Sequence, residues 1–301
     1  MNTGYRAILA EYMTWLDTLG YSNAIVDSCK SGINEFFEWL ERKKIQSINL
    51  LINKHISDYH HYLETRPNKC FKGRLLSLAH LNKNYFAVDK LLEFLHQYGV
   101  QSAPVPTNKR IKMDEQERIK KIEILTQQEI KTLYNSIENT YRDFNFEARQ
   151  AKQYELKLIL ALYYGCGLRR LEGYNLCLQD IDFDNKTVFV HQGKNYKDRI
   201  VPMSDGVYRE LMDYVYNFRH KLKLNHNRLF ISCYVALAKK FKYLQNCCRD
   251  ENIKAKKPNL HVLRHSIATH LLQNGMSIEN ISLFLGHGSL DSTQIYTHLI
   301  N

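Results

Sequence analysis

Residues 165–172 read Gly-Cys-Gly-Leu-Arg-Arg-Leu-Glu, and this stretch decides how the second half of the 301-residue chain is interpreted. We expect it to be a turn that follows a helix near 153–165 and leads into another helix, a position from which Arg169 can point into a cleft. Four further short motifs follow: Gly193-Lys194, His261-Val-Leu-Arg264-His265, Gly286-His287 and Tyr296. No single motif identifies the chemistry of a site, but the order and spacing of these motifs together indicate a site that holds a phosphodiester while a phenol attacks it.

The two arginines of these motifs are suited to a phosphodiester. A guanidinium group presents a planar fork of donors and stays charged at any workable pH, so Arg169 and Arg264 together can bind both non-bridging oxygens. Negative charge grows on those oxygens in a pentacoordinate transition state, and fixed cations beside them lower the barrier. Either arginine alone would more simply bind a surface carboxylate.

The histidines allow two interpretations. His261 lies three residues before Arg264 on one helix face, where it can accept or donate a proton near neutral pH. His261 and His265 are four residues apart, which is a zinc-ligand spacing, with His270 as a possible third ligand. No glutamate occupies the metalloprotease position, and His265 can equally be a core or supporting residue. We expect no metal and no other cofactor.

Lys194 and Tyr296 complete the expected chemistry. Lys194 lies at the tip of a predicted hairpin, from which its ammonium group can protonate a leaving 5′ oxygen; Lys197 and Arg199 are rivals, although Arg199 more simply supports the fold or contacts a phosphate. Tyr296 is the candidate nucleophile. A free phenol has a pKa of about 10, and neighbouring cations favour its ionised form, so that the phenolate can form. Attack would conserve the energy of the broken bond in a phosphotyrosine, so that resealing needs neither ATP nor metal.

These motifs, which extend over residues 165–298, resemble the tyrosine recombinase (phage integrase) family, and most closely its Xer-type members. The resemblance is carried by Gly-Leu-Arg169-x-x-Glu172, Gly-Lys194, His261-x-x-Arg264-His265, Leu-Gly-His287 and Thr-Gln-Ile-Tyr296-Thr-His. It implies specific roles for six residues. Arg169 and Arg264 would bind the scissile phosphate, Lys194 would protonate the departing oxygen, His261 would act as acid and base, His287 would hydrogen-bond the phosphate and Tyr296 would attack. Glu172 would hold its neighbours in place.

The chain departs from the family pattern in three places. Leu171 occupies a position where the family often has a small polar residue, and the hairpin before Lys194 is one residue longer than in Xer-type members. Only five residues follow Tyr296. Family members usually continue into a segment that docks on a neighbouring subunit, so we expect another contact to couple the subunits, or a longer natural tail.

Composition indicates which class of molecule the protein binds. The formal net charge is +11, which favours nucleic acid over other polyanions. No apolar run reaches the length of a membrane span, and the N-terminus lacks the layout of a signal peptide. The seven cysteines include no Cys-x-x-Cys pair, which indicates reduced thiols in a cytoplasmic protein.

The expected fold is mainly α-helical with a small antiparallel β-meander. Residues 1–100 show four stretches of helical apolar spacing, which predict a helical bundle. This bundle resembles the family's core-binding domain, and the resemblance implies that it binds DNA. Residues 101–122 contain two prolines and scattered basic residues, typical of a linker that lies along phosphates or is simply solvated. Residues 123–301 would form an α+β catalytic domain, and the two domains would clamp the DNA. The helices of this catalytic domain would include residues 260–274, 277–285 and 290–299.

The expected function is site-specific DNA recombination through a 3′-phosphotyrosine and a Holliday junction. The partner would be double-stranded DNA, bound at two sites by a homotetramer or by a heterotetramer with a second recombinase. One alternative is a non-catalytic DNA-binding protein of the same fold, and another is relaxation of supercoils by a type IB topoisomerase-like reaction. A metal-dependent nuclease is a third, which indifference to EDTA would exclude. These motifs do not specify which genetic element or chromosome the protein acts on, or which DNA sequence it recognises.

Overall fold

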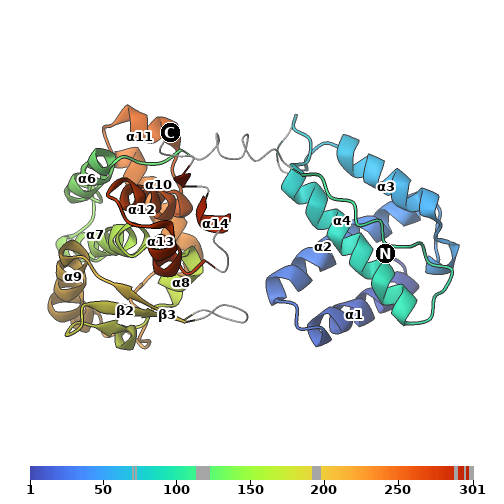
Figure 1. The fold of residues 1–301 in the computed structure, drawn as a ribbon, viewed down its shortest axis with the longest axis horizontal. Coiled ribbons are helices and arrows are strands. Elements are labelled where there is room, and N and C mark those ends of the chain that lie inside the picture. Colours follow the sequence, from blue (N-terminus) through green and yellow to red (C-terminus); the bar gives the residue numbers. More distant parts are fainter. Residues whose placement is uncertain are drawn as a thin grey trace. The chain divides into compact units, whose positions relative to one another are not determined.

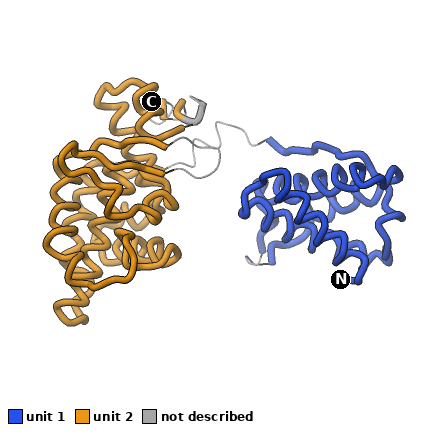
Figure 2. Tube along the Cα trace, turned by 90° about the horizontal axis from the view of Figure 1, so that it is seen from below, with its two compact units in different colours: residues 1–114 blue, residues 115–301 orange. Residues whose placement is uncertain are grey.

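The structure is a computed structural model that describes residues 1–69, 71, 73–112, 123–191, 198–287, 291–294 and 296–297. The chain divides into two compact units, residues 1–114 (unit 1) and residues 115–301 (unit 2), shown in Figure 2. Each unit has a hydrophobic core of its own. Within the described ranges, no helix combines the length and apolar character needed to cross a membrane.

Unit 1 is a helical bundle, as its apolar spacing predicts (Figure 1). Its elements are α1 (Thr3–Thr18), α2 (Asn23–Arg42), the short η1 (Ile48–Leu50), α3 (Asn53–Thr65) and α4 (Leu78–Gln97). The expected breaks are also present. Gly20 follows α1 with a φ of +78°, a conformation that suits glycine, and α3 ends where Arg66 precedes a proline.

The core of unit 1 forms where α2 packs against α4 and α1. Gly32 allows the close approach of α2 to α4, because a Cβ atom there would lie 3.2 Å from the Cβ of Ala87. Large aromatic side chains fill the remaining space, and the ring of Tyr5 stacks on that of Phe37 with centroids 4.4 Å apart. Burial of these apolar faces is what stabilises helices of this length.

The segment that follows α4 lies along that helix. The backbone N–H of Thr107 donates to Asp89 Oδ1 at 2.8 Å. The side-chain amide of Asn82 pairs with both backbone groups of Ile111, each at 2.9 Å. Residues 103–111 are therefore attached to unit 1, although they are the first part of the expected linker. The second part of that linker lies outside the described residues.

Unit 2 consists of packed helices and a small sheet, with the sheet at one end of the unit and α11 at the other (Figure 1). Its helices are α6 (Gln127–Ser136), α7 (Phe146–Ile159), α8 (Arg170–Asn175), α9 (Asp205–Met212), α10 (Tyr234–Cys247), α11 (Glu251–Lys256), α12 (Leu260–Gln273), α13 (Ile278–Leu285) and α14 (Asp291–Gln294). The other helical segments are the 3-10 turns η2 (Ile137–Asn139), η4 (Leu178–Asp180) and η6 (Arg219–Leu222) and the π-helical segments η3 (Leu160–Gly165) and η5 (Asp213–Phe218).

The sheet confirms the predicted antiparallel meander. Its strands are β1 (Ile181–Asp182), β2 (Thr187–Val190) and β3 (Arg199–Pro202), in the order β1-β2-β3. Val188 is paired with Val201, and both are fully buried, so one face of the sheet belongs to the core. The tip of the hairpin between β2 and β3 lies outside the described residues.

The last three helices place the end of the chain. The expected helices 260–274 and 277–285 are confirmed by α12 and α13. The expected helix over 290–299 is shorter in the described part of the chain, where α14 ends at Gln294 and Tyr296 lies in a turn. The N–H of Tyr296 donates to the carbonyl of Thr293 at 3.0 Å, which keeps this turn close to α14.

Candidate active site

Arg169 is positioned by the turn between η3 and α8. Gly167 adopts a φ of +59°, and a Cβ atom there would lie 2.9 Å from Leu285 Cδ2, so the turn requires glycine and passes close to α13. Arg169 immediately precedes α8, and its N–H donates to Glu172 Oε2 at 2.8 Å. This bond fixes the start of the helix, and with it the base of the Arg169 side chain.

Three arginines from distant parts of the sequence meet at the C-terminal end of α13. Their guanidinium groups donate to the carbonyl oxygens of three consecutive residues: Arg199 to Phe284 (3.0 Å), Arg264 to Leu285 (2.8 Å) and Arg169 to Gly286 (2.7 Å). The last carbonyls of a helix lack partners within it, and the helix dipole makes this end negative. The end of α13 thus gathers these cations, here called the arginine cluster (Arg169, Arg199 and Arg264).

Glu172 holds the arginine cluster from a second side. Its two carboxylate oxygens accept hydrogen bonds from Arg199 at 3.1 and 2.9 Å, and one of them accepts a bond from Arg169 Nη1 at 2.6 Å. Arg264 lies 3.9 Å away. Burial alone would raise the pKa of this carboxyl, but the bonds and charge of Arg199, with those of Arg169, lower it to about 2. Glu172 is therefore ionised at neutral pH, which offsets part of the positive charge.

Arg264 is the most deeply held of the three cations. It is buried, and besides its bond to α13 its Nη1 donates to the carbonyl of Gly167 at 2.7 Å. Burial, followed by the charge of Arg169, lowers the pKa of Arg264 to about 10. The group keeps its charge at neutral pH, and two backbone carbonyls fix the plane of its guanidinium before any substrate binds.

Tyr296 lies beside this cluster with only 1% of its surface exposed. Its hydroxyl is 3.1 Å from His265 Nδ1, and its ring lies nearly parallel to that of His287. Burial raises the pKa of Tyr296, whereas the charges of Arg264 and Arg169 lower it. Arg169 and Arg264 are therefore close enough to Tyr296 to influence its pKa, although Arg169 is far from it in the sequence.

His287 is held in its neutral form. Its Nδ1 pairs with Thr293 Oγ1 at 2.8 Å, which ties the end of α13 to α14. Burial, together with the positive charges of Arg264 and Arg169, lowers the pKa of His287 to about 4. A neutral imidazole beside the arginine cluster can donate a hydrogen bond to a phosphate oxygen without adding charge.

His261 is the second residue of α12, and Asn259 caps this helix by accepting the N–H of His261 at 2.8 Å. Partial burial and the charges of Arg264, Arg170 and Arg169 lower its pKa. The suggested third zinc ligand, His270, is instead paired through Nδ1 with the Tyr164 hydroxyl at 3.0 Å. Over the residues that the structure describes, no three His, Cys, Asp or Glu side chains are grouped to hold a metal ion.

The remaining candidates divide into two groups. Lys194 and its rival Lys197 lie outside the described residues. Arg199, the other rival, is 8% exposed and its side chain is taken up by Glu172 and α13, so it supports the fold. The motifs alone missed the contact between His265 and Tyr296 and the role of Thr293. The only signal for the first was that His265 follows Arg264 directly.

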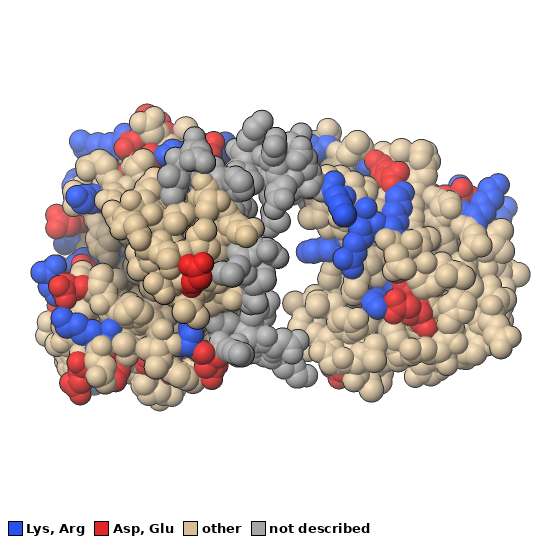
Figure 3. All heavy atoms as spheres, in the orientation of Figure 1, with Lys and Arg blue, Asp and Glu red and all other residues tan. Residues whose placement is uncertain are grey.

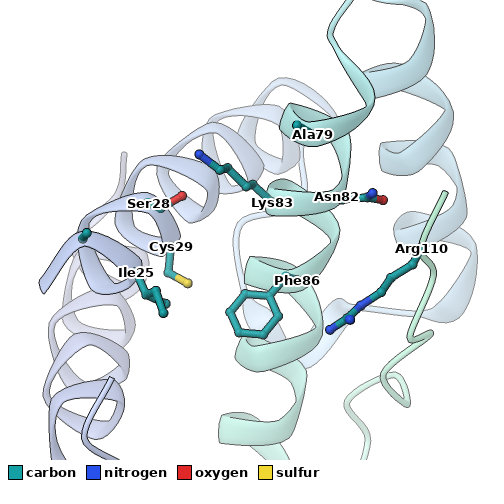
Figure 4. A pocket seen from close by; sticks show the side chains of 9 residues that line it. Ile25, Ser28, Cys29, Ala79, Asn82, Lys83, Phe86 and Arg110 are labelled. Atoms are coloured by element: carbon teal, nitrogen blue, oxygen red, sulfur yellow. The ribbon is translucent and has the colours of Figure 1, made fainter. Parts of the chain in front are cut away.

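Unit 1 carries a separate hollow between α2 and α4, with a volume of about 510 Å³. Figure 4 shows the side chains around it, among them Ile25, Ser28 and Cys29 from α2, Lys83 and Phe86 from α4, and Arg110 from the following segment. Its lining is mostly apolar, with two cations. Lys and Arg side chains also gather on part of the surface of unit 1 that is visible in Figure 3.

Comparison with known proteins decides the family. The family model described as the phage integrase family matches residues 123–301, which is more than half of the chain. The chain belongs to the phage integrase family. Among the curated relatives of this chain, the tyrosine recombinase XerD of Staphylococcus epidermidis is 26% identical over 310 residues, which cover 99% of this chain and 95% of that protein.

Other relatives are more similar to this chain, over a shorter stretch of sequence. The tyrosine recombinase of Pseudothermotoga lettingae is 35% identical over 153 residues, which cover 48% of this chain and 49% of that protein. The tyrosine recombinase XerA of Pyrococcus horikoshii is 37% identical over 153 residues, or 47% and 49%. The chain spans about half the length of these two relatives.

Solved structures establish the fold that this chain shares with other proteins. XerH recombinase bound to its difH substrate in a pre-cleavage complex superposes with a TM-score of 0.69, at 18% identity, over 97% of this chain and 92% of that one. The Tn1549 transposon integrase in complex with transposon right end DNA superposes with a TM-score of 0.67, at 19% identity, over 96% and 94%. At this identity the likeness concerns the fold alone.

Proposed function

We propose that this protein is a site-specific DNA recombinase that cleaves and rejoins strands through Tyr296. One observation carries the proposal: a buried tyrosine hydroxyl lies within the electrostatic reach of Arg169 and Arg264, both of which are oriented by the end of α13. The names of the relatives as tyrosine recombinases support the same assignment. A protein that only binds DNA has no need of a buried tyrosine hydroxyl close to two oriented cations.

The proposed reaction uses each of these groups. Arg169 and Arg264 bind the non-bridging oxygens of the scissile phosphate and stabilise the charge that grows there. The oxygen of Tyr296 forms a bond to phosphorus, the bond to the 5′ oxygen breaks, and a 3′-phosphotyrosine results. Lys194 gives a proton to the departing 5′ oxygen. The freed 5′ hydroxyl of another strand then attacks the phosphotyrosine, which restores the phosphodiester and releases the tyrosine.

The two remaining histidines act on the phosphate in this proposal. His287, which is neutral, donates a hydrogen bond to a non-bridging oxygen. His261 lies on the same helix face as Arg264 and exchanges a proton with the phosphate or with its attacking group. No metal or cofactor is needed for either step, because the bond energy is conserved in the phosphotyrosine.

The proposed substrate is double-stranded DNA at two specific sites, with four subunits in the complex that exchanges strands. Reconstitution of the complex distinguishes four copies of this chain from two pairs formed with a second recombinase. We assign DNA binding to a domain over 1–100, a basic linker to 101–122 and catalysis to 123–301. The cations of unit 1 would bind phosphates, and a DNA substrate together with free cysteines in the described chain supports a cytoplasmic enzyme.

Covalent trapping tests this function. Nicked duplexes tiled across the DNA that flanks the gene are incubated with wild type and with Tyr296→Phe in EDTA, and the products are separated on denaturing gels. A protease-sensitive shifted band with wild type only is the expected result. Binding without any covalent band, with or without a second recombinase, would contradict the proposal in favour of a non-catalytic DNA-binding protein. Cleavage that EDTA abolishes would indicate a metal-dependent nuclease.

A further inference from the structure

The hydroxyl of Tyr296 has a hydrogen-bond partner, His265, which has no part in the reaction described above. His265 Nδ1 lies 3.1 Å from this oxygen, and the two rings are 5.7 Å apart between centroids. Within the described part of the chain, His265 is the only hydrogen-bond partner of the hydroxyl. His265 follows Arg264 on α12, so the residue that contacts the nucleophile is adjacent in sequence to one that would contact the phosphate.

The other histidines near the site are placed differently. The ring of His287 lies against the face of Tyr296, with centroids 6.2 Å apart and planes at 17°, while its Nδ1 is taken by Thr293. His261 makes no contact with Tyr296 in the described structure. The geometry therefore separates two positions: one imidazole nitrogen at the nucleophile and other imidazoles beside the phosphate-binding arginines.

The surroundings of the hydroxyl make a proton acceptor necessary. Tyr296 is buried, so its proton cannot pass directly to bulk water, and burial raises the pKa of the phenol. The positive charges of Arg264 and Arg169 favour the phenolate that must form. A neighbouring base that receives the proton during attack is the usual way to activate a weak hydroxyl nucleophile.

We propose that His265 is a catalytic residue that positions Tyr296 and accepts its proton during attack. This inference rests on the proposed function. As the oxygen of Tyr296 bonds to phosphorus and the bond to the 5′ oxygen breaks, the phenolic proton passes to Nδ1 of His265, which must be unprotonated beforehand. In the rejoining step the same proton returns to the departing tyrosine, and His261 is left to act on the phosphate.

The first test separates proton acceptance from simple packing. In His265→Asn the side-chain amide occupies the place of Nδ1 and can still hydrogen-bond to the hydroxyl, but it cannot take a proton. We expect single-turnover cleavage of the trapped duplex to slow about 100-fold, the scale of lost general-base catalysis. His270→Asn is the matched control, because His270 lies on the same helix and pairs through Nδ1 with the Tyr164 hydroxyl at 3.0 Å. It should cleave at nearly the wild-type rate.

The second test removes the nucleophile. In a Tyr296→Phe background, a strand that carries a 3′-p-nitrophenyl phosphate is ligated to a 5′ hydroxyl, a reaction that needs the phosphate site but no tyrosine. We expect His265→Asn to leave this ligation nearly unchanged in that background. An equal loss in ligation and cleavage would overturn the assignment, since His265 would then support the whole site. Wild-type cleavage by His265→Asn would overturn it as well.

A measurement on the wild-type chain does not depend on any variant at position 265 folding correctly. The ¹⁵N spectrum of the histidine side chains should show a non-protonated Nδ1 for His265 at pH 7.5, and its signal should move in Tyr296→Phe. A protonated Nδ1 at that pH would contradict proton acceptance. Absence of any covalent product with wild type, in contrast, would contradict the proposed function itself.

Discussion

At the scale of single residues, two kinds of acceptor hold the cations of the site. The carbonyls at the end of α13 fix one edge of each guanidinium, and Glu172 binds Arg199 and Arg169 from another side. Neither acceptor is a substrate group, so the arginines have their orientation before DNA binds. Preorganisation of this kind spares the reaction the cost of arranging charges in the transition state.

Glu172→Gln should destabilise unit 2 in a pH-dependent way. The pKa of Glu172 is lowered to about 2 in the folded protein, below its value in an unfolded chain. Its contribution is therefore fully present above about pH 4.5 and is lost as the pH falls towards 2. At neutral pH we expect a loss of roughly 3 kcal/mol in the free energy of unfolding, measured by urea denaturation.

The pH dependence is the distinguishing feature of this prediction. Wild type and Glu172→Gln should approach each other in stability between pH 4.5 and pH 2. Glu251→Gln, in which the acidic partner of an exposed pair with Lys254 is changed, should stay within about 0.5 kcal/mol of wild type throughout. A difference for Glu172→Gln that does not change with pH would show that the ion pair is not its cause.

Residue types predicted the charged groups of the site but not what holds them. Arg169, Arg264 and Tyr296 were identified by motif spacing, and the structure brings them together. The sequence does not decide whether Arg199 supports the fold or contacts a phosphate, because its partner Glu172 comes from a different element. The carbonyls of α13 could not be predicted at all, since every residue has one and only tertiary packing decides which cation it meets.

At the scale of elements, the end of α13 is the structure on which the arginine cluster depends. Gly286 adopts a φ of +67° there, and its carbonyl binds Arg169. Gly286→Ala forces an alanine into the left-handed region at a cost of about 1–2 kcal/mol, and it should also displace the carbonyl. We expect both lower thermal stability and slower covalent trapping.

Gly275→Ala is the matched control for this prediction. Gly275 lies one residue beyond Asn274, the cap of α12, and also has a positive φ (+84°), and a Cβ atom there would meet nothing within 4 Å. It should lose a similar amount of stability because of the same backbone strain, but keep the wild-type rate of trapping. Equal rates for the two glycine variants would mean that the end of α13 does not control the arginines.

Elements with a clear period were predicted well, and segments without one were not. The helices of unit 1 and the meander follow from spacings of 3.6 and 2 residues. Residues 103–111 have no such pattern, and their attachment to α4 depends on the side chains of Asn82 and Asp89, which nothing in the local sequence indicates. The predicted helix over 290–299 is longer than α14, the helix that the described part of this stretch contains.

At the scale of the whole molecule, a net charge of +11 must act through particular cations. Lys83 and Arg110 line the hollow between α2 and α4 and are our candidates for phosphate contacts. Because each lost contact releases about one counterion fewer, Lys83→Ala and Arg110→Ala should each reduce the magnitude of the slope of log K against log salt by about 1. Titrations of a trapped site between low and moderate salt measure this slope.

The control for the salt dependence is Lys54→Ala, which removes a charge from α3, an element that does not line the hollow. It should leave the slope unchanged. Equal reductions for all three variants would mean that the net charge, and not the hollow, controls the affinity for DNA.

The most direct measurement of the central claim is the site of covalent attachment. The trapped protein–DNA adduct is digested with protease and nuclease, and the modified peptide is sequenced by mass spectrometry. We predict one nucleotide joined through its 3′ phosphate to Tyr296, the residue beside the arginine cluster. Attachment to any other of the 20 tyrosines, or through a 5′ phosphate, would contradict the account.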